Sequence, residues 1–244
     1  MNITGHCIVK NEDQFIKFTI GSALPFLDRL IIYDTGSADK TVSIIESIKS
    51  PKILFAQKGP QSPTGITVLR NEMIAQTKTD WFFLLDGDEV WNNNQLENYL
   101  KFTLSQPKNI LATFLRTRNC VGDIYHYRGE SSGRYKIAGM KGHLNIRAYR
   151  KTLEWTGEYP LEKCVDTTDK NSLAFFDGYY WHMSHLKRSS SKIPVPGFRR
   201  HVFDLGICAN KNELPEVFAS QDFPHRSKIY EIISIGAEIF RKSR

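Results

Sequence analysis

Two aspartates separated by one glycine, Asp86 and Asp88, are the residues of this sequence best suited to chemistry. They follow an apolar run at residues 81–85, of the kind that forms a strand buried on both faces. Asp-Gly pairs also make ordinary turns, but a buried strand that runs straight into acidic residues indicates that its tip faces a site. Carboxylate oxygens bind hard cations such as Mg²⁺ and Mn²⁺, often jointly with substrate phosphates. The segment therefore predicts a divalent cation at the end of this strand.

The elements that must position these aspartates alternate between strand and helix patterns. The strand patterns lie at residues 3–9, 29–34, 52–57 and 80–85, and the helical ones at 12–24, 40–49 and 67–77. This alternation predicts an α/β fold with right-handed βαβ units and a parallel sheet. Ligands of such sheets bind beyond the carboxyl ends of the strands. We therefore expect convergence of the polar residues that follow the strands: Lys10, Asn11, Glu12, Asp34, Asp86 and Asp88.

The pattern changes after a predicted helix at residues 95–104. Strand signals at 112–118, 124–127, 144–149 and 174–181 are joined by glycine-rich loops, which predicts antiparallel or mixed pairing. The tail from residue 187 is helical and loop-like. It ends in one apolar stripe made of Ile229, Ile232, Ile233, Gly236, Ile239 and Phe240. We expect this stripe to pack back on the domain, with dimerisation or contact with a membrane surface, beside Arg241, Lys242 and Arg244, as the alternative.

The net charge of +7 is concentrated in one stretch of the 244-residue chain. Residues 116–151 hold nine lysines and arginines against Asp123 and Glu130, and the rest of the chain is balanced. Such a stretch is either a solvated surface or a site that attracts phosphates of a nucleotide, a lipid carrier or a nucleic acid. The acidic segment upstream of it favours an anionic ligand.

Composition and cysteine usage indicate a cytoplasmic globular protein. The apolar runs are too short to span a bilayer, and the residues after Met1 are polar, unlike a signal peptide. Cys7, Cys120, Cys164 and Cys208 are scattered, which favours free thiols in a reducing compartment. We expect a cytoplasmic location, at the inner face of the membrane if the C-terminal tail contacts lipid.

Four motifs in sequence resemble one known family. They are CIVKNE at residues 7–12, YDTGSADKT at 33–41, RNEMIAQTKTDWFFLLDGDEVW at 70–91 and RAYRKTLEWTGEYPLE at 147–162. Together they resemble the inverting, family-two nucleotide-sugar glycosyltransferases. The resemblance implies the GT-A fold, with a central, mostly parallel twisted sheet flanked by helices and a mixed-strand acceptor half. It implies a domain at residues 1–186, with a nucleotide-binding half at 1–91, an acceptor half at 92–186 and a C-terminal extension at 187–244.

The resemblance also implies site roles. Val9 and Glu12 would line the pocket for the base and ribose, Asp34 would bind the base edge, and Arg70 and Asn71 would contact the nucleotide or its phosphates. Asp86 would lie near the ribose and sugar, and Asp88 would bind Mn²⁺ or Mg²⁺. Lys187, Arg188 or the basic loop at residues 134–141 could add positive charge against the leaving diphosphate.

The catalytic base and a further metal ligand are each left with two candidates. Relatives carry His-Glu after a segment like residues 147–155, and here Leu161 and Glu162 occupy that place, so Glu162 is the candidate base and Glu158 the alternative. Relatives often supply a histidine ligand near the last strand, where this chain has His182 and His185, with His182 ranked first.

The expected reaction moves a sugar from a UDP- or GDP-sugar to a hydroxyl of a glycan or lipid-linked acceptor, in glycan or cell-surface polysaccharide synthesis. A sugar nucleotidylyltransferase is the nearest enzymatic alternative, but it would open with a glycine-rich loop where this chain has VKNE at residues 9–12. A basic RNA-binding module would use residues 116–151 with Tyr125, Tyr127 and Tyr135, and would leave the aspartates unexplained. We therefore expect no nucleic acid partner. A homodimer formed through the apolar stripe of the C-terminal tail stays an alternative.

Overall fold

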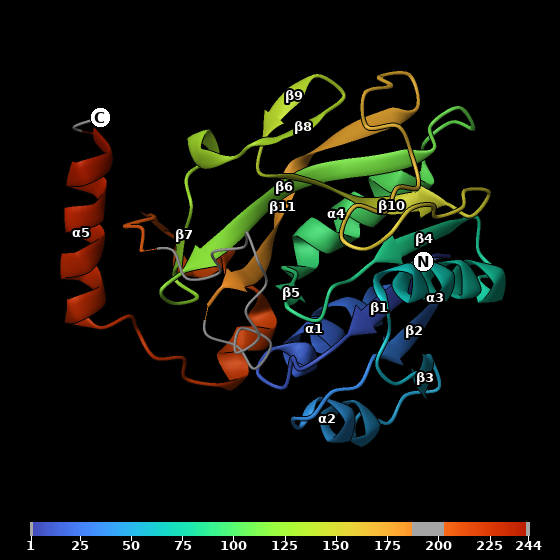
Figure 1. Cartoon of the computed structure of the whole chain (residues 1–244), viewed down its shortest axis with the longest axis horizontal. Coiled ribbons are helices and arrows are strands. Elements are labelled where there is room, and N and C mark those ends of the chain that lie inside the picture. The colour runs from blue at the N-terminus through green and yellow to red at the C-terminus, as the bar shows by residue number, and fades with distance from the viewer. Residues whose placement is uncertain (1, 187–202, 243–244) are drawn as a thin grey trace.

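One curled sheet organises the molecule (Figure 1). The structure is a computed structural model that describes residues 2–186 and 203–242. Within these residues ten strands form the sheet, whose main path runs β12-β7-β6-β10-β4-β1-β2-β3. β11 pairs with β6 and β5 beside this path. Helices cover the sheet, and the C-terminal helix α5 stands at the edge of the molecule (Figure 1).

The N-terminal half of the sheet is parallel, as the alternating patterns predict. It consists of β1 (Thr4–Val9), β2 (Arg29–Asp34), β3 (Ile53–Gln57) and β4 (Trp81–Leu84). β1 lies between β2 and β4, where His6 is level with Ile31 and Leu84. All four carboxyl ends therefore lie at one edge. The helices between them are α1 (Ile16–Ala23), followed by η1 (Leu24–Phe26), α2 (Thr41–Ser47) and α3 (Pro63–Gln76).

The second half pairs in mixed directions, as expected. Its elements are β5 (Glu89–Val90), α4 (Asn93–Leu104), β6 (Ala112–Val121), β7 (His126–Tyr127), β10 (Leu144–Arg150), β11 (Leu173–His185) and β12 (Ile207–Cys208). β10 is antiparallel to both β4 and β6. β11 runs parallel to β6 and, further along, antiparallel to the short β5. This last pairing brings the end of β11 to the residues that follow Asp88.

Two elements differ from the sequence prediction for local reasons. α3 begins at Pro63 rather than at residue 67, because Ser62 caps it: its hydroxyl oxygen accepts a hydrogen bond from the Gly65 amide at 3.0 Å, and proline suits the first turn. The expected basic loop at residues 134–141 is instead a hairpin of β8 (Tyr135–Ile137) and β9 (Met140–Gly142), preceded by η2 (Glu130–Ser132).

Aromatic packing fixes the segment that carries the aspartates. Trp91 is fully buried and stacks on Tyr180 of β11 and Tyr99 of α4, with ring centroids 4.7 and 5.7 Å apart. Phe83 of β4 packs against the edge of Trp91 at 5.2 Å. Burying aromatic side chains of this size contributes about 2–3 kcal/mol each. The acidic turn between Phe83 and Trp91 is therefore anchored at both ends.

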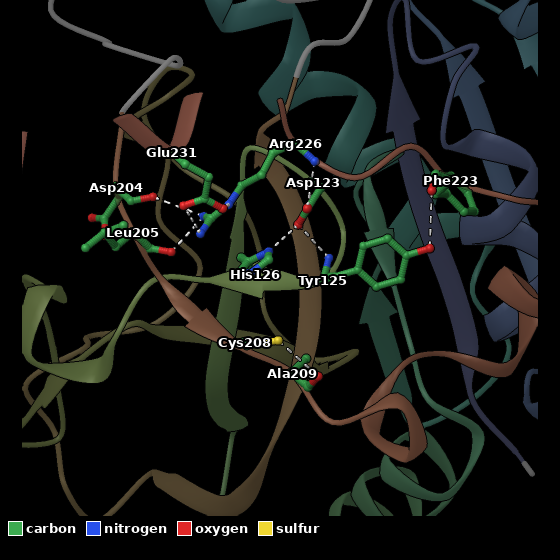
Figure 2. A network of polar contacts seen from close by, with 10 residues as sticks. All are labelled: Asp123, Tyr125, His126, Asp204, Leu205, Cys208, Ala209, Phe223, Arg226 and Glu231. Atoms are coloured by element: carbon green, nitrogen blue, oxygen red, sulfur yellow. Dashed lines mark hydrogen bonds and ion pairs between the residues drawn. The ribbon is translucent and has the colours of Figure 1, made fainter. Parts of the chain in front are cut away.

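The C-terminal residues are tied to the body through Asp123, in the loop after β6 (Figure 2). The Asp123 carboxylate accepts hydrogen bonds from the Tyr125 amide, His126 Nδ1 and the Arg226 amide, at 2.9, 2.7 and 3.0 Å. The Arg226 guanidinium in turn binds both carboxylate oxygens of Glu231, at 2.5 and 3.0 Å. These contacts fix the start of α5 (Lys228–Lys242). The chain before it contains η4 (Lys211–Glu213) and η5 (Glu216–Ser220).

The apolar stripe of α5 faces outward, so the expectation that it packs on the domain is wrong. Ile229, Ile232 and Ile239 are 65–69% exposed, and Phe240 is 59% exposed. The helix turns its other side inward: Ser234 is fully buried and Tyr230 packs on Phe203 at 5.0 Å. Contact of the stripe with a lipid surface or a second copy stays a prediction. In residues 2–186 and 203–242, none of the helices has the length and apolar character to span a bilayer.

The η5 segment belongs to the same packed body. Phe218 is 5% exposed and lies 5.5 Å from the Phe18 ring of α1. The extension is thus continuous with the domain at this point, and the expected boundary at residue 187 stays a prediction.

We expect the substitution Asp123→Ala to destabilise the protein by about 2 kcal/mol, because three partly buried donors lose their acceptor at once. Urea unfolding followed by circular dichroism measures this. Asp222→Ala, which removes an exposed carboxylate, is the matched control and should leave the midpoint unchanged. An Asp123→Ala midpoint equal to that of the wild type would show that the network does not stabilise the fold.

Candidate functional site

The loops that follow β1 and β2 are joined by hydrogen bonds. Asn11 adopts a positive φ of 56°, donates from its amide to the Ser37 hydroxyl at 2.8 Å and accepts from the Ala38 amide at 2.7 Å. The Glu12 amide donates to the Thr41 hydroxyl, also at 2.8 Å. Asparagine tolerates this backbone region better than most residues. Two of the four motifs therefore form one structural unit at the carboxyl ends of neighbouring strands.

Asp34 shapes this unit from within. It is 2% exposed, and its Oδ1 accepts hydrogen bonds from the Gly36 and Ser37 amides, each at 3.0 Å. The Ser37 hydroxyl bonds to its other oxygen. The carboxylate thus holds the turn that follows β2, and its contact with a nucleobase stays a prediction.

Gly87 brings the acidic turn into contact with the end of β1. A Cβ atom placed on Gly87 would lie 2.8 Å from Val9 Cγ2 and 3.2 Å from Glu12 Cβ, so only glycine allows this approach. The Gly87 carbonyl also accepts a hydrogen bond from the Thr19 hydroxyl at 3.0 Å. Asp86 and Asp88 are therefore placed beside Val9 and Glu12, as convergence of the strand ends requires.

Asp88 meets His182 where β11 passes the acidic turn. His182 Nε2 lies 3.2 Å from Asp88 Oδ2, and the Met183 amide donates to the Asp88 carbonyl at 3.0 Å. In the β5–β11 pairing His182 is level with Glu89, whereas His185 is level with Val121 of β6. Of the two candidate histidines, the structure places His182 against Asp88.

Arg147 is a site residue to which the sequence assigns no role. Its side chain, 7% exposed, lies 3.3 Å from Asp86 Oδ2 and forms an ion pair with the fully buried Glu89. Its Nε donates to the Tyr180 hydroxyl at 3.0 Å. In the sequence Arg147 stands within an otherwise mostly apolar strand pattern at residues 144–149, and a charged residue in such a place was the available signal.

Burial and the crowded acids shift the pKa values of two groups here. Burial raises the pKa of the Glu89 carboxyl to about 8, even though the Arg147 guanidinium beside it acts to lower it. Burial alone would lower the pKa of His182, but the Asp88 carboxylate beside it, together with Glu89, more than offsets this, so the pKa of His182 is raised. The acidic turn therefore favours a positive charge at His182.

A second cluster joins α3 to the motif at residues 147–162. Arg70 Nε lies 3.1 Å from Glu162 Oε1, and its guanidinium lies over the Trp155 ring at 4.8 Å. The Asn71 side chain donates to the Trp155 carbonyl at 2.9 Å and accepts from the Trp155 amide at 2.8 Å. Arg70 and Asn71 thus hold the segment that carries Glu162, and their expected contacts with a nucleotide stay predictions.

The two candidate bases differ in their surroundings. The Glu162 side chain is 7% exposed, and its Oε2 is buried with no hydrogen-bond partner among the described residues. Glu158 is exposed, and its Oε1 accepts a hydrogen bond from the Thr64 hydroxyl at 3.0 Å. Lys187 and Arg188, expected near the diphosphate, lie outside the described residues.

The donor set at the acidic turn suits a divalent cation that is shared with a ligand. Asp88 Oδ2 and His182 Nε2, two possible metal ligands, lie 3.2 Å apart. Asp86, whose side chain is 42% exposed, lies with Asp88 on the turn that follows β4. Within residues 2–186 and 203–242, no three histidine, cysteine or carboxylate side chains are arranged to hold a metal ion by themselves. Mg²⁺ and Mn²⁺ sites in which phosphate oxygens complete the coordination need only one or two carboxylates. The residues therefore fit a metal held between protein and diphosphate.

Solved structures with the same fold include glycosyltransferases. The Staphylococcus aureus TarS fragment 1–349 in complex with UDP-GlcNAc matches with a TM-score of 0.53 and 14% identity, over 80% of this chain and 62% of that one. Glucosyl-3-phosphoglycerate synthase from Mycobacterium tuberculosis, in complex with phosphoglyceric acid, matches with a TM-score of 0.51 and 15% identity, over 74% of this chain and 71% of that one. The fold of this chain is thus the GT-A fold.

Sequence comparisons place the chain in a family. A TPR repeat-containing protein of Synechococcus elongatus is 29% identical over 126 residues, which cover 50% of this chain and 28% of that protein. The model of glycosyl transferase family 2 matches residues 7–159, which include both strand-end motifs, the acidic turn and Trp155. The match covers more than half of the sequence. The chain belongs to glycosyl transferase family 2.

Proposed function

We propose that this protein is a metal-dependent, inverting glycosyltransferase, and that it moves a sugar from a UDP- or GDP-sugar to a hydroxyl of a glycan or lipid-linked acceptor. The observation that carries the proposal is the meeting of Asp88 and His182 on a turn that also carries Asp86 and that lies beside Val9 and Glu12. Acids of one strand end, a histidine of a distant strand and the end of β1 share one edge of the sheet. The complex of TarS with UDP-GlcNAc supports a nucleotide sugar as the donor.

The chemistry explains these residue types. Transfer from a nucleoside diphosphate sugar leaves a diphosphate whose negative charge grows in the transition state. A divalent cation, Mn²⁺ or Mg²⁺, stabilises that charge when bound, and such stabilisation raises the rate. Asp88, His182 and Asp86 would hold the cation, and Val9 and Glu12 would line the nucleoside pocket beside it. Asp34 keeps the neighbouring loop in shape for the base.

Glu162 is the proposed base. A single displacement with inversion requires a carboxylate that takes the proton of the acceptor hydroxyl. Arg70 holds Glu162 Oε1 at 3.1 Å and leaves Oε2 without a partner among the described residues, so one oxygen is positioned and the other has free lone pairs. Glu158 is the alternative, and its carboxylate is exposed on a loop beside α3.

Internal pairing of the basic stretch argues against an RNA-binding module. Arg116 binds Asp177, Arg118 binds Glu213 and Arg128 binds Asp204. Arg147 and Arg150 are likewise engaged within the fold. The arginines that gave residues 116–151 their charge therefore mostly stabilise the structure. Membership in glycosyl transferase family 2 also argues against a sugar nucleotidylyltransferase.

We expect Asp88→Asn to reduce Mn²⁺- or Mg²⁺-dependent hydrolysis of the best UDP- or GDP-sugar by at least about 100-fold, because the leaving diphosphate loses its counter-charge. A screen of nucleotide sugars with each metal, followed by kinetics on the substrate found, measures this. Asp80→Asn, an exposed aspartate just before the same strand, is the matched control and should retain full activity.

Two outcomes of this screen would contradict the proposal. Equal hydrolysis by Asp88→Asn and the wild type would remove Asp88 from the metal site. Wild-type activity that persists in excess chelator would exclude metal dependence while leaving glycosyl transfer intact.

We expect Glu162→Gln to lower kcat for the same donor hydrolysis by about 10²–10⁴-fold, because water then lacks its base. The amide keeps an oxygen for Arg70, so UDP affinity measured by calorimetry should not change. Glu158→Gln is the matched variant and should have nearly wild-type kcat. The reverse result, with Glu158→Gln inactive and Glu162→Gln active, would move the base to Glu158.

A further inference from the structure

Three carboxylates crowd the turn after β4. Asp86, Asp88 and Glu89 lie within four residues, Glu89 is fully buried, and the Asp88 side chain is 6% exposed. Like charges brought together out of water repel one another strongly. A turn of this composition keeps its shape if positive charge lies among the acids or if one of them binds a proton.

Arg147 supplies that charge from a strand far away in the sequence. Its guanidinium contacts the buried Glu89 on one side and lies 3.3 Å from Asp86 Oδ2 on the other, at the edge of the sheet where the strands β1, β2 and β4 end. Glu89 is buried, whereas the Asp86 side chain is 42% exposed. Arg147 therefore connects a buried anchor with an exposed carboxylate at the edge of the sheet.

The guanidinium is itself fixed from behind. Its Nε donates to the Tyr180 hydroxyl at 3.0 Å, and the Asn145 side-chain amide lies 2.7 Å from the same hydroxyl. With the Asn145 oxygen directed at Tyr180, the hydroxyl donates to it and accepts from Arg147. The Tyr180 ring stacks on Trp91 at the far end of the acidic turn. A planar fork with several donors can hold Glu89, Asp86 and Tyr180 at once, which a lysine cannot do.

We propose that Arg147 is a positioning residue that holds the Asp86 carboxylate at the rim, so that Asp86 and Asp88 present oxygens to one shared cation and diphosphate. In this account Glu89 serves to hold Arg147 and does not contact the ligand. The inference rests on the proposed function, because it concerns the same metal site. It also separates two roles of Arg147: the charge that compensates Glu89 and the contact that orients Asp86.

Substitutions at both members of the buried pair separate these roles. Arg147→Gln removes both contacts and leaves the buried Glu89 carboxyl without its partner, so that it must bind a proton or remain as an unpaired buried charge. The double variant Glu89→Gln/Arg147→Gln replaces the pair with two neutral amides, so the unpaired buried carboxyl disappears while Asp86 still lacks its cation. Arg147→Lys keeps the positive charge but replaces the planar guanidinium, which can contact Glu89, Asp86 and Tyr180 at once, with a single ammonium group. Arg150→Gln, on the same strand, is the control, because Arg150 donates to the carbonyls of Gln106, Pro107 and Ile110.

The measurements are the melting temperature and the Kd for Mn²⁺ in the presence of UDP, from electron paramagnetic resonance of free Mn²⁺. We expect Arg147→Gln to lower the melting temperature and weaken Mn²⁺ binding about 10–100-fold, the size of effect seen when groups that orient metal ligands are removed. The double variant should recover the melting temperature but not the Mn²⁺ affinity. Arg147→Lys should fold and bind Mn²⁺ more weakly, and Arg150→Gln should bind it as the wild type does.

Recovery of both properties in the double variant would overturn the inference, because Arg147 would then only compensate Glu89. Wild-type Mn²⁺ affinity in Arg147→Lys and in the double variant would overturn it too, and would leave the metal site of the proposed function intact. A wild type that binds no Mn²⁺ with UDP present would overturn the metal assignment and this inference together.

Discussion

Asp86, Asp88 and Glu89 repel one another at the acidic turn, and the positive groups around them are arranged to offset that repulsion. Carboxylates at such spacing are stabilised by positive charge or by a bound proton, and the protein supplies part of that charge itself, through Arg147 and the His182 side chain. The pKa of Glu89 is raised above all by its burial, with Asp86 and Asp88 adding to the shift, and the pKa of His182 is raised by the Asp88 and Glu89 carboxylates despite its burial. A turn that gathers so much negative charge is well suited to a cation that arrives with an anionic substrate, which is how we propose that the donor diphosphate is held.

The fold meets this constraint by bringing distant strands to one edge. The loops after β1 and β2 lie at this edge because parallel strands end at the same side of the sheet. The acidic residues follow β4, which lies between β1 and the mixed half of the sheet. β10 and β11 then supply Arg147 and His182 through antiparallel pairing with β4 and β5. The packing of Trp91 on Tyr180 and Tyr99 holds the turn against these strands. The aromatic residues around the site therefore belong to the hydrophobic core, and they act on the site by holding the turn in place.

The sequence was sufficient to predict the parallel half of the sheet, because the hydrophobic period and length of each strand and the polar residues that follow it are local properties. The rule that parallel strands bind ligands beyond their carboxyl ends was enough to place Asp34, Asp86 and Asp88 at one edge. Arg147 and Glu89 were not recognised, since their contact depends on β10 inserting next to β4, a pairing between residues more than fifty positions apart. For α5, the amphipathic pattern correctly predicted a helix, but a pattern cannot tell which side meets the body. Tyr230, Ser234 and the Arg226 network decide that, and they lie on the less apolar side.

In the proposed function the acidic turn and the donor diphosphate hold the cation jointly, so the binding of Mn²⁺ and the binding of UDP should each strengthen the other. Because the described residues do not form a complete metal site by themselves, Mn²⁺ titrated into the wild type should bind at least about tenfold more tightly with saturating UDP than without it, and the same factor should appear in the UDP affinity. An Mn²⁺ affinity that UDP does not change would contradict the account.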